Sequence, residues 1–312
     1  MNKSAILFAS FLLMVFSCSP KSYDFRFFAI GDMPYHLPGD FERFERLTDA
    51  LNREKPLFTV HVGDIKAGNT PCSDEYLMKI HGYFGQFHHP LIFTPGDNEW
   101  TDCHRDVAGS YDPNERLDKI RQIFYQERNI YGSPLMLTSQ NTHKGYEKFV
   151  ENAIWENKGI MFGTFHVVGS NNNLKKEPGP LTEAQEHQER DAANIYWLEE
   201  LFNQARNNKS QGVILFLHAS LNFQDSSDNG FKGFTQRLQE EVLAFEKPIL
   251  MIYGDHHRFL MEKPLREESG KVVKHFTSLM VFGDKDMHAV EIRVNKKDDS
   301  LFDIKQYFVE GN

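Results

Sequence analysis

The chain has 312 residues, of which 40% are hydrophobic and 25% charged, with 35 Lys and Arg against 44 Asp and Glu. These proportions are those of a folded protein, and they exclude a disordered chain and a repeat fibre. The net charge of −9 argues against a nucleic-acid-binding surface, which needs clustered basic residues. A phosphate-bearing substrate would therefore need local positive charge, most simply from bound metal.

The first residues have the character of a targeting segment. Lys3 precedes the unbroken apolar run Ala5–Phe16. This run is shorter than the about 20 residues that a membrane-spanning helix needs, but it suits a signal peptide. Ser17 and Cys18 follow directly, so the segment resembles a bacterial lipoprotein signal.

The resemblance implies cleavage before Cys18 and lipidation of that residue. It places the protein in the bacterial envelope, anchored to a membrane on the periplasmic or the cell-surface side. We therefore divide the chain into a signal peptide at 1–17, a tether at 18–23 and one domain at 24–312. Simple secretion, with Cys18 lost or incidental, is the alternative interpretation.

Export also bears on the two remaining cysteines. Cys72 and Cys103 would lie in an oxidising compartment, where an even pair usually forms a disulfide. We predict that they are bonded to each other, and metal-binding or catalytic thiols are the alternative.

Apolar strands alternate with amphipathic helices in the first half of the domain. This order and spacing predict a parallel βαβαβ arrangement followed by a helix that starts at Asp112. The predicted strands are Phe25–Ile30, Leu57–Val62 and Leu91–Thr94, and the helices between them are Asp40–Glu54 and Asp74–Phe87.

The second half begins with a predicted hairpin and ends with predicted antiparallel strands. Between them we expect an Asn-rich loop at Ser170–Gly179, a long helix opening at Thr182, and a strand, a helix and a strand. The hairpin strands are Tyr146–Ile154 and Gly159–Gly169, the middle elements are Gly212–Leu217, Phe234–Phe245 and Pro248–Tyr253, and the last strands are Lys274–Phe282, His288–Val294 and Leu301–Phe308.

Residues with metal-binding side chains follow five of the predicted strands. Asp32, Asp64 and Asp97 each come after a glycine, His218 follows the strand Gly212–Leu217, and Asp255–His257 follow the next strand. In open α/β sheets, ligands bind outside the carboxyl ends of the strands, so these side chains should converge there. The pattern predicts two metal ions that share one aspartate. We interpret Gly283-Asp284 as a turn only.

Five stretches in this order resemble the calcineurin-like metallophosphoesterases. They are Gly31–Tyr35, Gly63-Asp64, Gly96–Glu99, His218 and Gly254–His257. The resemblance extends over residues 24–295 and is to a divergent secreted bacterial branch. It implies an α/β fold with four layers, in which helices flank two mixed β-sheets in an αββα sandwich. It also implies hydrolysis of a phosphoester by a metal-bound hydroxide.

The resemblance further implies a ligand set. Asp64 would bridge the metals, Asp32 and His257 would complete one site, and Asp97, His218 and Asp255 would complete the other. The chain departs from the family where Pro34 replaces a histidine ligand, Asp97 an amide ligand and Asp255 an imidazole.

Another departure concerns the proton donor. Asn98 stands where the family has the histidine that protonates the leaving group, and an amide cannot act as an acid at neutral pH. We take Asn98, Glu99 and His104 as the catalytic candidates. His104, Tyr35 and His36 are the candidates to replace the lost acid. The alternative for each of them is that it is an ordinary loop residue.

Three residues are candidates for substrate contact. Besides Tyr35, Lys66 follows the bridging aspartate and Asn171 follows a predicted strand. A solvated loop charge is the alternative for Lys66, and a simple turn is the alternative for Asn171.

Four carboxylates and only two imidazoles make the implied metal site rich in oxygen. Such a site favours Mn²⁺ or Mg²⁺ over Zn²⁺, and iron is a further alternative. The sequence therefore indicates an exported phosphoester hydrolase that acts on a small molecule and uses two divalent ions. A catalytically impaired surface lipoprotein that binds metal and a ligand is one alternative, and a hydrolase of another ester or amide is a second.

The lipoprotein prediction can be tested by labelling cells with a radioactive fatty acid. The wild-type protein should be labelled, whereas Cys18→Ala protein should not, because the substitution removes the thiol that carries the lipid. Equal labelling of both proteins would contradict lipidation at Cys18.

Overall fold

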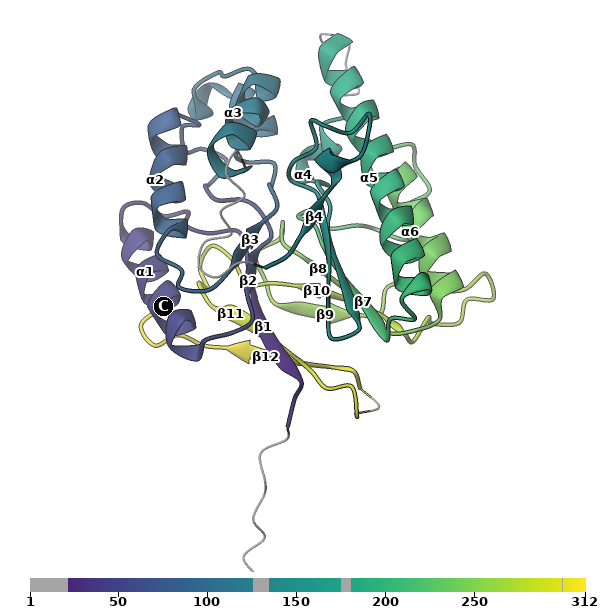
Figure 1. Ribbon diagram of the computed structural model, residues 1–312. Coiled ribbons are helices and arrows are strands. Elements are labelled where there is room, and N and C mark those ends of the chain that lie inside the picture. The colour runs from purple at the N-terminus through teal and green to yellow at the C-terminus, as the bar shows by residue number, and fades with distance from the viewer. Residues whose placement is uncertain (1–21, 126–134, 175–180, 299) are drawn as a thin grey trace, which may run out of the picture.

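The computed structural model describes residues 22–125, 135–174, 181–298 and 300–312 (Figure 1). The predicted signal peptide, Cys18, most of the tether and the second half of the loop Ser170–Gly179 lie outside the described residues. None of the helices in the described ranges is both long and apolar enough to cross a membrane.

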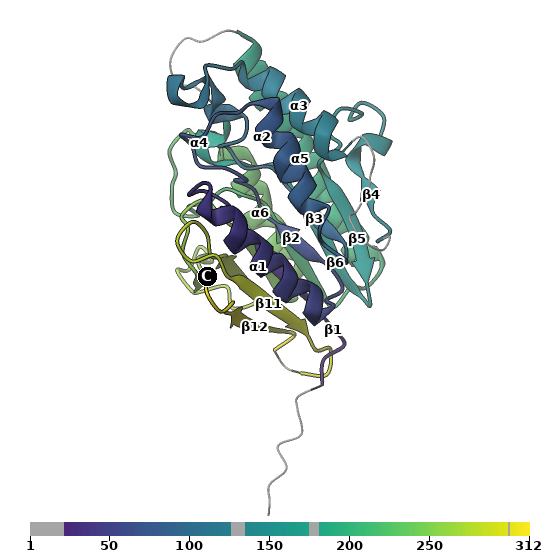
Figure 2. The ribbon, with the colours of Figure 1, turned by 90° about the vertical axis from the view of Figure 1, so that its left-hand side faces the viewer.

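The first sheet has five strands, of which the three from the first half of the domain are parallel as predicted. In order across the sheet they are β12 (Phe302–Tyr307), β11 (Ala289–Val294), β1 (Phe25–Ile30), β2 (Thr59–His61) and β3 (Leu91–Phe93). Strand β11 is antiparallel to both β1 and β12. Helices α1 (Gly39–Glu54), α2 (Asp74–Phe84) and α3 (Pro113–Tyr125) cover its outer face (Figure 2). They bury the apolar positions that recur at helical spacing, such as Phe44, Leu47 and Leu51 of α1.

The second sheet has seven strands, with a parallel centre. In order they are β4 (Thr138–Ser139), β5 (Ala153–Asn157), β6 (Ile160–Thr164), β7 (Gly212–Phe216), β8 (Ile249–Tyr253), β10 (Phe276–Met280) and β9 (Leu260–Glu262). The hairpin β5–β6 turns at Lys158-Gly159, where both residues have positive φ, as a tight hairpin turn requires. Helices α5 (Leu181–Asn207) and α6 (Lys232–Phe245) cover the outer face of this sheet.

Short helical segments complete the chain between these elements. They are η1 (Thr101–His104), η2 (Asp106–Ala108), η3 (Gln140–Thr142) and α4 (Gly169–Asn172). Segments η1 and η2 lie between β3 and α3, and α4 lies between β6 and α5. These three segments are on the side of the predicted metal residues.

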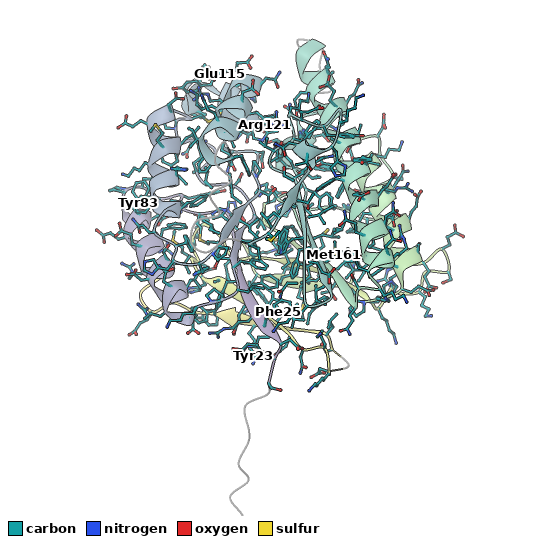
Figure 3. All side chains as sticks on the ribbon, viewed as in Figure 1. Tyr23, Phe25, Tyr83, Glu115, Arg121 and Met161 are labelled. Atoms are coloured by element: carbon teal, nitrogen blue, oxygen red, sulfur yellow. A yellow bond between two sulfur atoms is a disulfide. The ribbon has the colours of Figure 1, made fainter. Side chains whose placement is uncertain are left out.

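Aromatic side chains hold the two sheets face to face. Phe27 stacks on Phe58 in the first sheet with ring centroids 4.7 Å apart, and Trp155 stacks on Phe162 in the second at 5.1 Å. Across the interface, the Phe58 ring meets the Phe162 ring edge-on at 5.5 Å. These rings are buried, and each stabilises the fold by about 2–3 kcal/mol. Side chains fill the space between the sheets (Figure 3). The predicted four-layer arrangement of helices, sheet, sheet and helices is therefore confirmed.

The prediction for the last strands is wrong in one respect. The segment Lys274–Phe282 contains β10, which pairs with β8 in parallel and belongs to the second sheet. The long connection after β8 forms the edge strand β9 and leaves enough chain to return in the same direction. Of the three segments predicted as antiparallel strands, only those that form β11 and β12 pair with each other in this way. As a result, the carboxyl end of β10 lies at the same sheet edge as that of β8.

A buried histidine in β2 makes the stability of this fold depend on pH. The His61 side chain is fully buried, its Nδ1 accepts a hydrogen bond from Gly63 N at 3.3 Å, and its Nε2 lies 3.1 Å from Met33 O. Burial is the main reason why the pKa of His61 is lowered to about 3. The unfolded chain takes up this proton near pH 6.5 and the folded chain only near pH 3, so the free energy of unfolding falls as the pH drops below 6.5.

We expect this one group to remove about 3 kcal/mol of stability between pH 6.5 and pH 4. His61→Gln should remove that part of the pH dependence, because glutamine does not titrate. The exposed His88 provides a control, since His88→Gln should keep the wild-type slope. The measurement is urea unfolding at several pH values with a chelator present. Parallel curves for wild type and His61→Gln would contradict the prediction.

Candidate metal centre

The six predicted metal ligands lie at the carboxyl edges of the two sheets. Within these residues, two groups have ligand atoms that all lie within 4.8 Å of one another. One group is Asp32, Asp64 and His257, and the other is Asp64, Asp97 and His218. Asp64 belongs to both groups, which is the position that a bridging carboxylate must occupy.

Left-handed backbone turns aim these side chains. Asp32, Asp64 and Asp255 have φ values of 53°, 55° and 80°, and each follows a glycine. Aspartate tolerates this conformation better than most residues because its short polar side chain can bond locally. At Gly96, an added Cβ would lie 2.1 Å from Asp64 Oδ1, so only glycine allows the β3 loop to approach that carboxylate. The Gly-Asp pairs are therefore a geometric requirement of the site.

Three ligand atoms in the described part of the chain are buried without a hydrogen bond. They are Asp32 Oδ2, Asp97 Oδ1 and His218 Nε2. His218 Nε2 lies 3.1 Å from Asp97 Oδ1 and 3.4 Å from Asp64 Oδ1, while its Nδ1 is 2.8 Å from the carbonyl oxygen of Val62. A backbone carbonyl at Nδ1 is the usual partner of a metal-binding histidine, because it holds the proton there and frees Nε2. These residues fit a pair of divalent cations.

The pKa values of Asp32, Asp64 and His218 are all raised, which reflects burial and the negative charge at the site. Burial raises the pKa of Asp32 to about 7, and it raises the pKa of Asp64 well above its usual range. Burial alone would lower the pKa of His218, but the charges of Asp64, Asp32 and Asp97 raise it well above its ordinary value. Without cations, the site would have to gather protons to reduce this repulsion.

Asp255 lies beside these groups. Its backbone N donates to Asp32 Oδ1 at 3.0 Å, and its Oδ2 accepts from Ser220 N at 3.1 Å. An added Cβ on Gly169 would lie 2.4 Å from Asp97 Oδ1 and 2.8 Å from Asp255 Oδ1, so the two carboxylates flank that glycine. Asp255 is thus near Asp97 but is not one of the residues within the 4.8 Å groups.

The side chain of Asn98 is committed to Asp64. Asn98 N donates to Asp64 Oδ1 at 3.0 Å, and Asn98 Nδ2 donates to Asp64 Oδ2 at 2.5 Å. Tyr35 OH donates to the same Oδ2 at 2.7 Å, and its ring lies 4.9 Å from that of His257. Burial and the charge of Asp64 raise the pKa of Tyr35 well above its usual value, so the phenol stays protonated. Both residues therefore orient the shared carboxylate.

Lys66 and Glu99 are buried beneath the site. Lys66 Nζ donates to Asn98 O at 2.7 Å, and burial lowers the pKa of this amine to about 8. Glu99 Oε1 accepts from Gly96 N at 2.6 Å, and burial raises the pKa of the Glu99 carboxyl. The structure places both side chains on the backbone of the loop that carries Asp97. A contact of Lys66 with substrate and a catalytic role of Glu99 stay predictions.

The predicted Cys72–Cys103 disulfide is present, with the two Cα atoms 5.8 Å apart. It joins the loop after β2 to the loop after β3. The Sγ atoms of Cys72 and Cys103 lie 3.6 and 3.7 Å from Asn98 O, next to the amine of Lys66. The bond therefore fixes the two loops that carry Asp64 and Asn98.

Other predicted residues lie at the rim. His104 is exposed, and its Nδ1 lies 2.7 Å from Thr101 O. Asn171 accepts from Gly230 N at 2.9 Å and donates to Leu174 O. Asn171 is one of four successive residues, 170–173, whose backbone has positive φ. The first of them, Ser170, contacts a candidate metal ligand. Ser170 Oγ is 2.8 Å from both Asp97 Oδ2 and Asp102 Oδ1, a contact that the sequence reasoning did not single out.

Asp284 is the main residue that the sequence reasoning missed. It follows Gly283 at the end of β10, has a φ of 45°, and donates its backbone N to Asp32 O at 2.7 Å. Its side chain contacts the exposed His36, and its Oδ2 lies 3.8 Å from His257 Nδ1. The other ring nitrogen, His257 Nε2, lies 3.6 Å from Asp32 Oδ1. Asp284 thus stands behind His257, on the side away from Asp32. The parallel direction of β10, which was not predicted, was the signal that could have found it.

The fold and this donor set define an α/β protein with a candidate dinuclear metal centre. Residues 25–259 match the family model for calcineurin-like phosphoesterases, so the chain belongs to that family. No curated protein sequence matches the chain.

Solved structures share the fold at low sequence identity. A dimetal phosphatase from Danio rerio superposes with a TM-score of 0.58 at 11% identity, covering 92% of this chain and 97% of that one. TT1561 of Thermus thermophilus gives a TM-score of 0.49 at 10% identity, covering 90% and 98%. A 5′-nucleotidase from Candida albicans gives 0.47 at 14%, covering 92% of this chain and 51% of that chain.

The position of Asp284 behind His257 predicts a selective effect on metal binding. Asp284→Asn should weaken one of two Mn²⁺ sites by about 10- to 100-fold, because a carboxylate behind a ligating imidazole orients it and raises its basicity. Asp64→Asn should weaken both sites, since that residue belongs to both groups. Isothermal titration with Mn²⁺ measures the two affinities.

Asp286→Asn is the matched control, because Asp286 is an exposed aspartate of the same turn. It should leave both affinities within twofold of wild type. Two unchanged affinities in Asp284→Asn, with a wild-type melting temperature, would contradict the role of this residue.

Proposed function

We propose that the protein is an exported, metal-dependent hydrolase of small-molecule phosphoesters. The observation that carries the proposal is the set of buried ligand atoms without a hydrogen bond around Asp64, from loops that follow strands of both sheets. Membership of the calcineurin-like phosphoesterase family supports the reaction class. The signal-like N-terminus and the Cys72–Cys103 disulfide support export, because such bonds persist in oxidising compartments.

The residues divide into two metal sites with a common carboxylate. Asp32 and His257 would hold one ion, Asp97 and His218 would hold the other, and Asp64 would contribute to both. When bound, such ions supply positive charge to the phosphoryl oxygens and lower the pKa of water. Asn98 and Tyr35 fix the position of Asp64, and the Val62 carbonyl fixes the ring of His218.

Oxygen ligands dominate this centre. Three carboxylates and two imidazoles would hold the ions, and the carboxylate of Asp255 lies next to Asp97. This donor set favours Mn²⁺ or Mg²⁺ over Zn²⁺, and it also suits iron.

Asn98, which stands where the family has its acid, cannot supply a proton. Asn98 Nδ2 donates to Asp64 Oδ2 and also lies 3.0 Å from Tyr35 OH, so the amide is already fully engaged. His104 and His36 are exposed at the rim. We therefore infer that turnover is fastest for leaving groups of low pKa, which depart without protonation.

The same observation favours a second candidate function. A centre that binds metal but lacks an acid would serve a surface protein that binds a phosphorylated ligand without turnover. The position of Asn98 on Asp64 supports this alternative as well.

Aryl phosphates with leaving groups of different pKa separate the two functions. For the Mn²⁺-loaded protein, kcat/KM should fall about tenfold or more for each two units by which the leaving-group pKa rises from p-nitrophenol to phenol, because no residue protonates the departing oxygen. Asp64→Asn should abolish turnover. Absence of turnover with every ester, in protein that binds two ions, would favour the binding function.

A rate that does not depend on the leaving-group pKa would show instead that a side chain does donate a proton. His104→Gln and His36→Gln then identify the donor, because only its loss would restore the dependence.

A further inference from the structure

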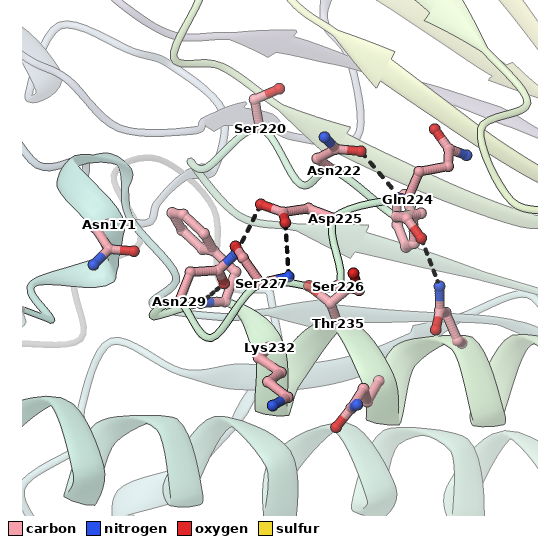
Figure 4. Close-up of a pocket in the computed structure, with 14 residues that line it drawn as sticks. Asn171, Ser220, Asn222, Gln224, Asp225, Ser226, Ser227, Asn229, Lys232 and Thr235 are labelled. Carbon is pink, nitrogen blue, oxygen red and sulfur yellow. Dashed lines mark hydrogen bonds between the residues drawn. The ribbon is translucent and has the colours of Figure 1, made fainter.

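A pocket of about 800 Å³ lies between the loop after β7 and the first half of α6 (Figure 4). It lies among the loop after β7, the start of α6 and the left-handed turn at 170–173. We call it the amide pocket, defined by a lining that runs from Asn171 and Ser220 to Gln239 of α6. Its volume is in the range of about 300–1,000 Å³ that is typical of small-molecule sites.

Two wall residues connect the amide pocket to the metal centre. Ser220, in its wall, donates its backbone N to Asp255 Oδ2 at 3.1 Å. Asn171, also in its wall, follows Ser170, whose hydroxyl lies 2.8 Å from Asp97 Oδ2. A phosphoester with its phosphoryl group at the metal centre would therefore have its alcohol portion next to this pocket.

The lining is chemically uniform. Ten of its fourteen residues carry an uncharged amide or hydroxyl side chain, and two more are the half-buried rings of Phe223 and Phe231. Amides and hydroxyls each offer both donors and acceptors, which is what a ligand with many hydroxyl groups requires. Aromatic faces can pack against the C–H surface of a sugar ring.

The two charged lining residues are already paired. Asp225 accepts from Ser227 N at 2.8 Å and from Asn229 Nδ2 at 3.0 Å, as the dashed lines in Figure 4 show. Lys232 Nζ lies 3.3 Å from Asp228 Oδ1. The pocket therefore presents little net charge, and it does not suit a phosphate or another strongly charged group.

Contacts with α6 and with the segments at Pro264 and Phe276 hold the loop that covers α6. Gln239 of α6 donates to Phe223 O at 3.2 Å, Gln224 donates to Pro264 O at 2.8 Å, and the Phe223 ring packs on Phe276 at 5.4 Å. A wall that is held before the ligand arrives loses less conformational entropy on binding.

We propose that the amide pocket binds the alcohol portion of the substrate as a neutral, polyhydroxylated sugar ring. The ring is either a hexosyl group or the ribose of a nucleotide, which share this chemistry. The inference rests on the proposed function for the position of the phosphoryl group, and it adds the substrate class to it.

Gln236 allows the pocket to be blocked without touching the metal residues. It is an exposed lining residue in the first half of α6, and Gln236→Trp would place an indole over the pocket. Gln211→Trp is the control, because Gln211 is an exposed glutamine just before β7, outside the lining. The substrates are glucose 1-phosphate, AMP and p-nitrophenyl phosphate, each with the Mn²⁺-loaded protein.

Gln236→Trp should lower kcat/KM at least tenfold for glucose 1-phosphate or AMP, through a higher KM, and leave p-nitrophenyl phosphate within twofold. Whichever sugar ester shows the loss identifies the ring. Gln211→Trp should change none of the three. Equal effects on all substrates, or no effect on either sugar ester, would overturn the proposal.

Binding without turnover separates this inference from the proposed function. Saturation-transfer NMR on the full protein should detect methyl glucoside or adenosine in wild type and Gln211→Trp but not in Gln236→Trp. If no ester is hydrolysed and this pattern is seen, the pocket assignment holds and the hydrolase function fails. If no ligand signal depends on Gln236, the pocket assignment fails whatever the activity.

Discussion

The crowding of carboxylates around Asp64 is the constraint on which the rest of this structure depends. Asp32, Asp64 and Asp97 are buried, and Asp255 lies beside them. Such a cluster is stable only if cations or protons neutralise it, because buried like charges repel strongly in a medium of low polarity. Burial, and after it the charges of the neighbouring carboxylates, raises the pKa of Asp32 and of Asp64, and ligand atoms without a hydrogen bond lie around them.

The aromatic interface between the sheets brings these carboxylates together. Phe27, Phe58, Trp155 and Phe162 pack the inner faces so that the carboxyl edges of both sheets meet. Asp64 comes from one sheet and His218 from the other, yet their ligand atoms lie 3.4 Å apart. Close packing of large rings tolerates little sliding, so it transmits the register of the sheets to the metal site. The Cys72–Cys103 disulfide holds the loops after β2 and β3 against the same edge. Lys66 supports them from below through its hydrogen bond to Asn98 O.

Much of this arrangement could be predicted because it depends on local sequence. Helical spacing located α1 and α2, and Gly-Asp pairs at strand ends located Asp32 and Asp64. Features that depend on pairing between strands far apart in the sequence were not predicted. The direction of β10 is set by the path through β9, and no local pattern in Lys274–Phe282 distinguishes parallel from antiparallel pairing.

Two further misses share this cause. Asp284 reads as a turn in the sequence, and it reaches His257 only because β10 runs parallel to β8. For Lys66 the sequence suggested a contact with substrate, with a solvated loop charge as the alternative, and it did not predict that the fold buries the amine against the Asn98 carbonyl. A charged side chain that finds a carbonyl partner inside the protein has no periodic signature, since burial of this kind follows from tertiary packing.

The unusual amide at position 98 follows from the same concentration of charge. Asp64 Oδ2 already faces Tyr35 and accepts from Asn98 Nδ2, while Oδ1 accepts from Asn98 N. These neutral donors stabilise the ionised carboxylate without competing with a cation, as an imidazolium at this position would. Where carboxylates replace imidazoles as ligands, the shared aspartate needs more hydrogen-bond support and the centre needs less added positive charge. In the proposed centre, one electrostatic arrangement would therefore account for both the amide at position 98 and the additional carboxylates, because Asn98 orients Asp64 without adding positive charge.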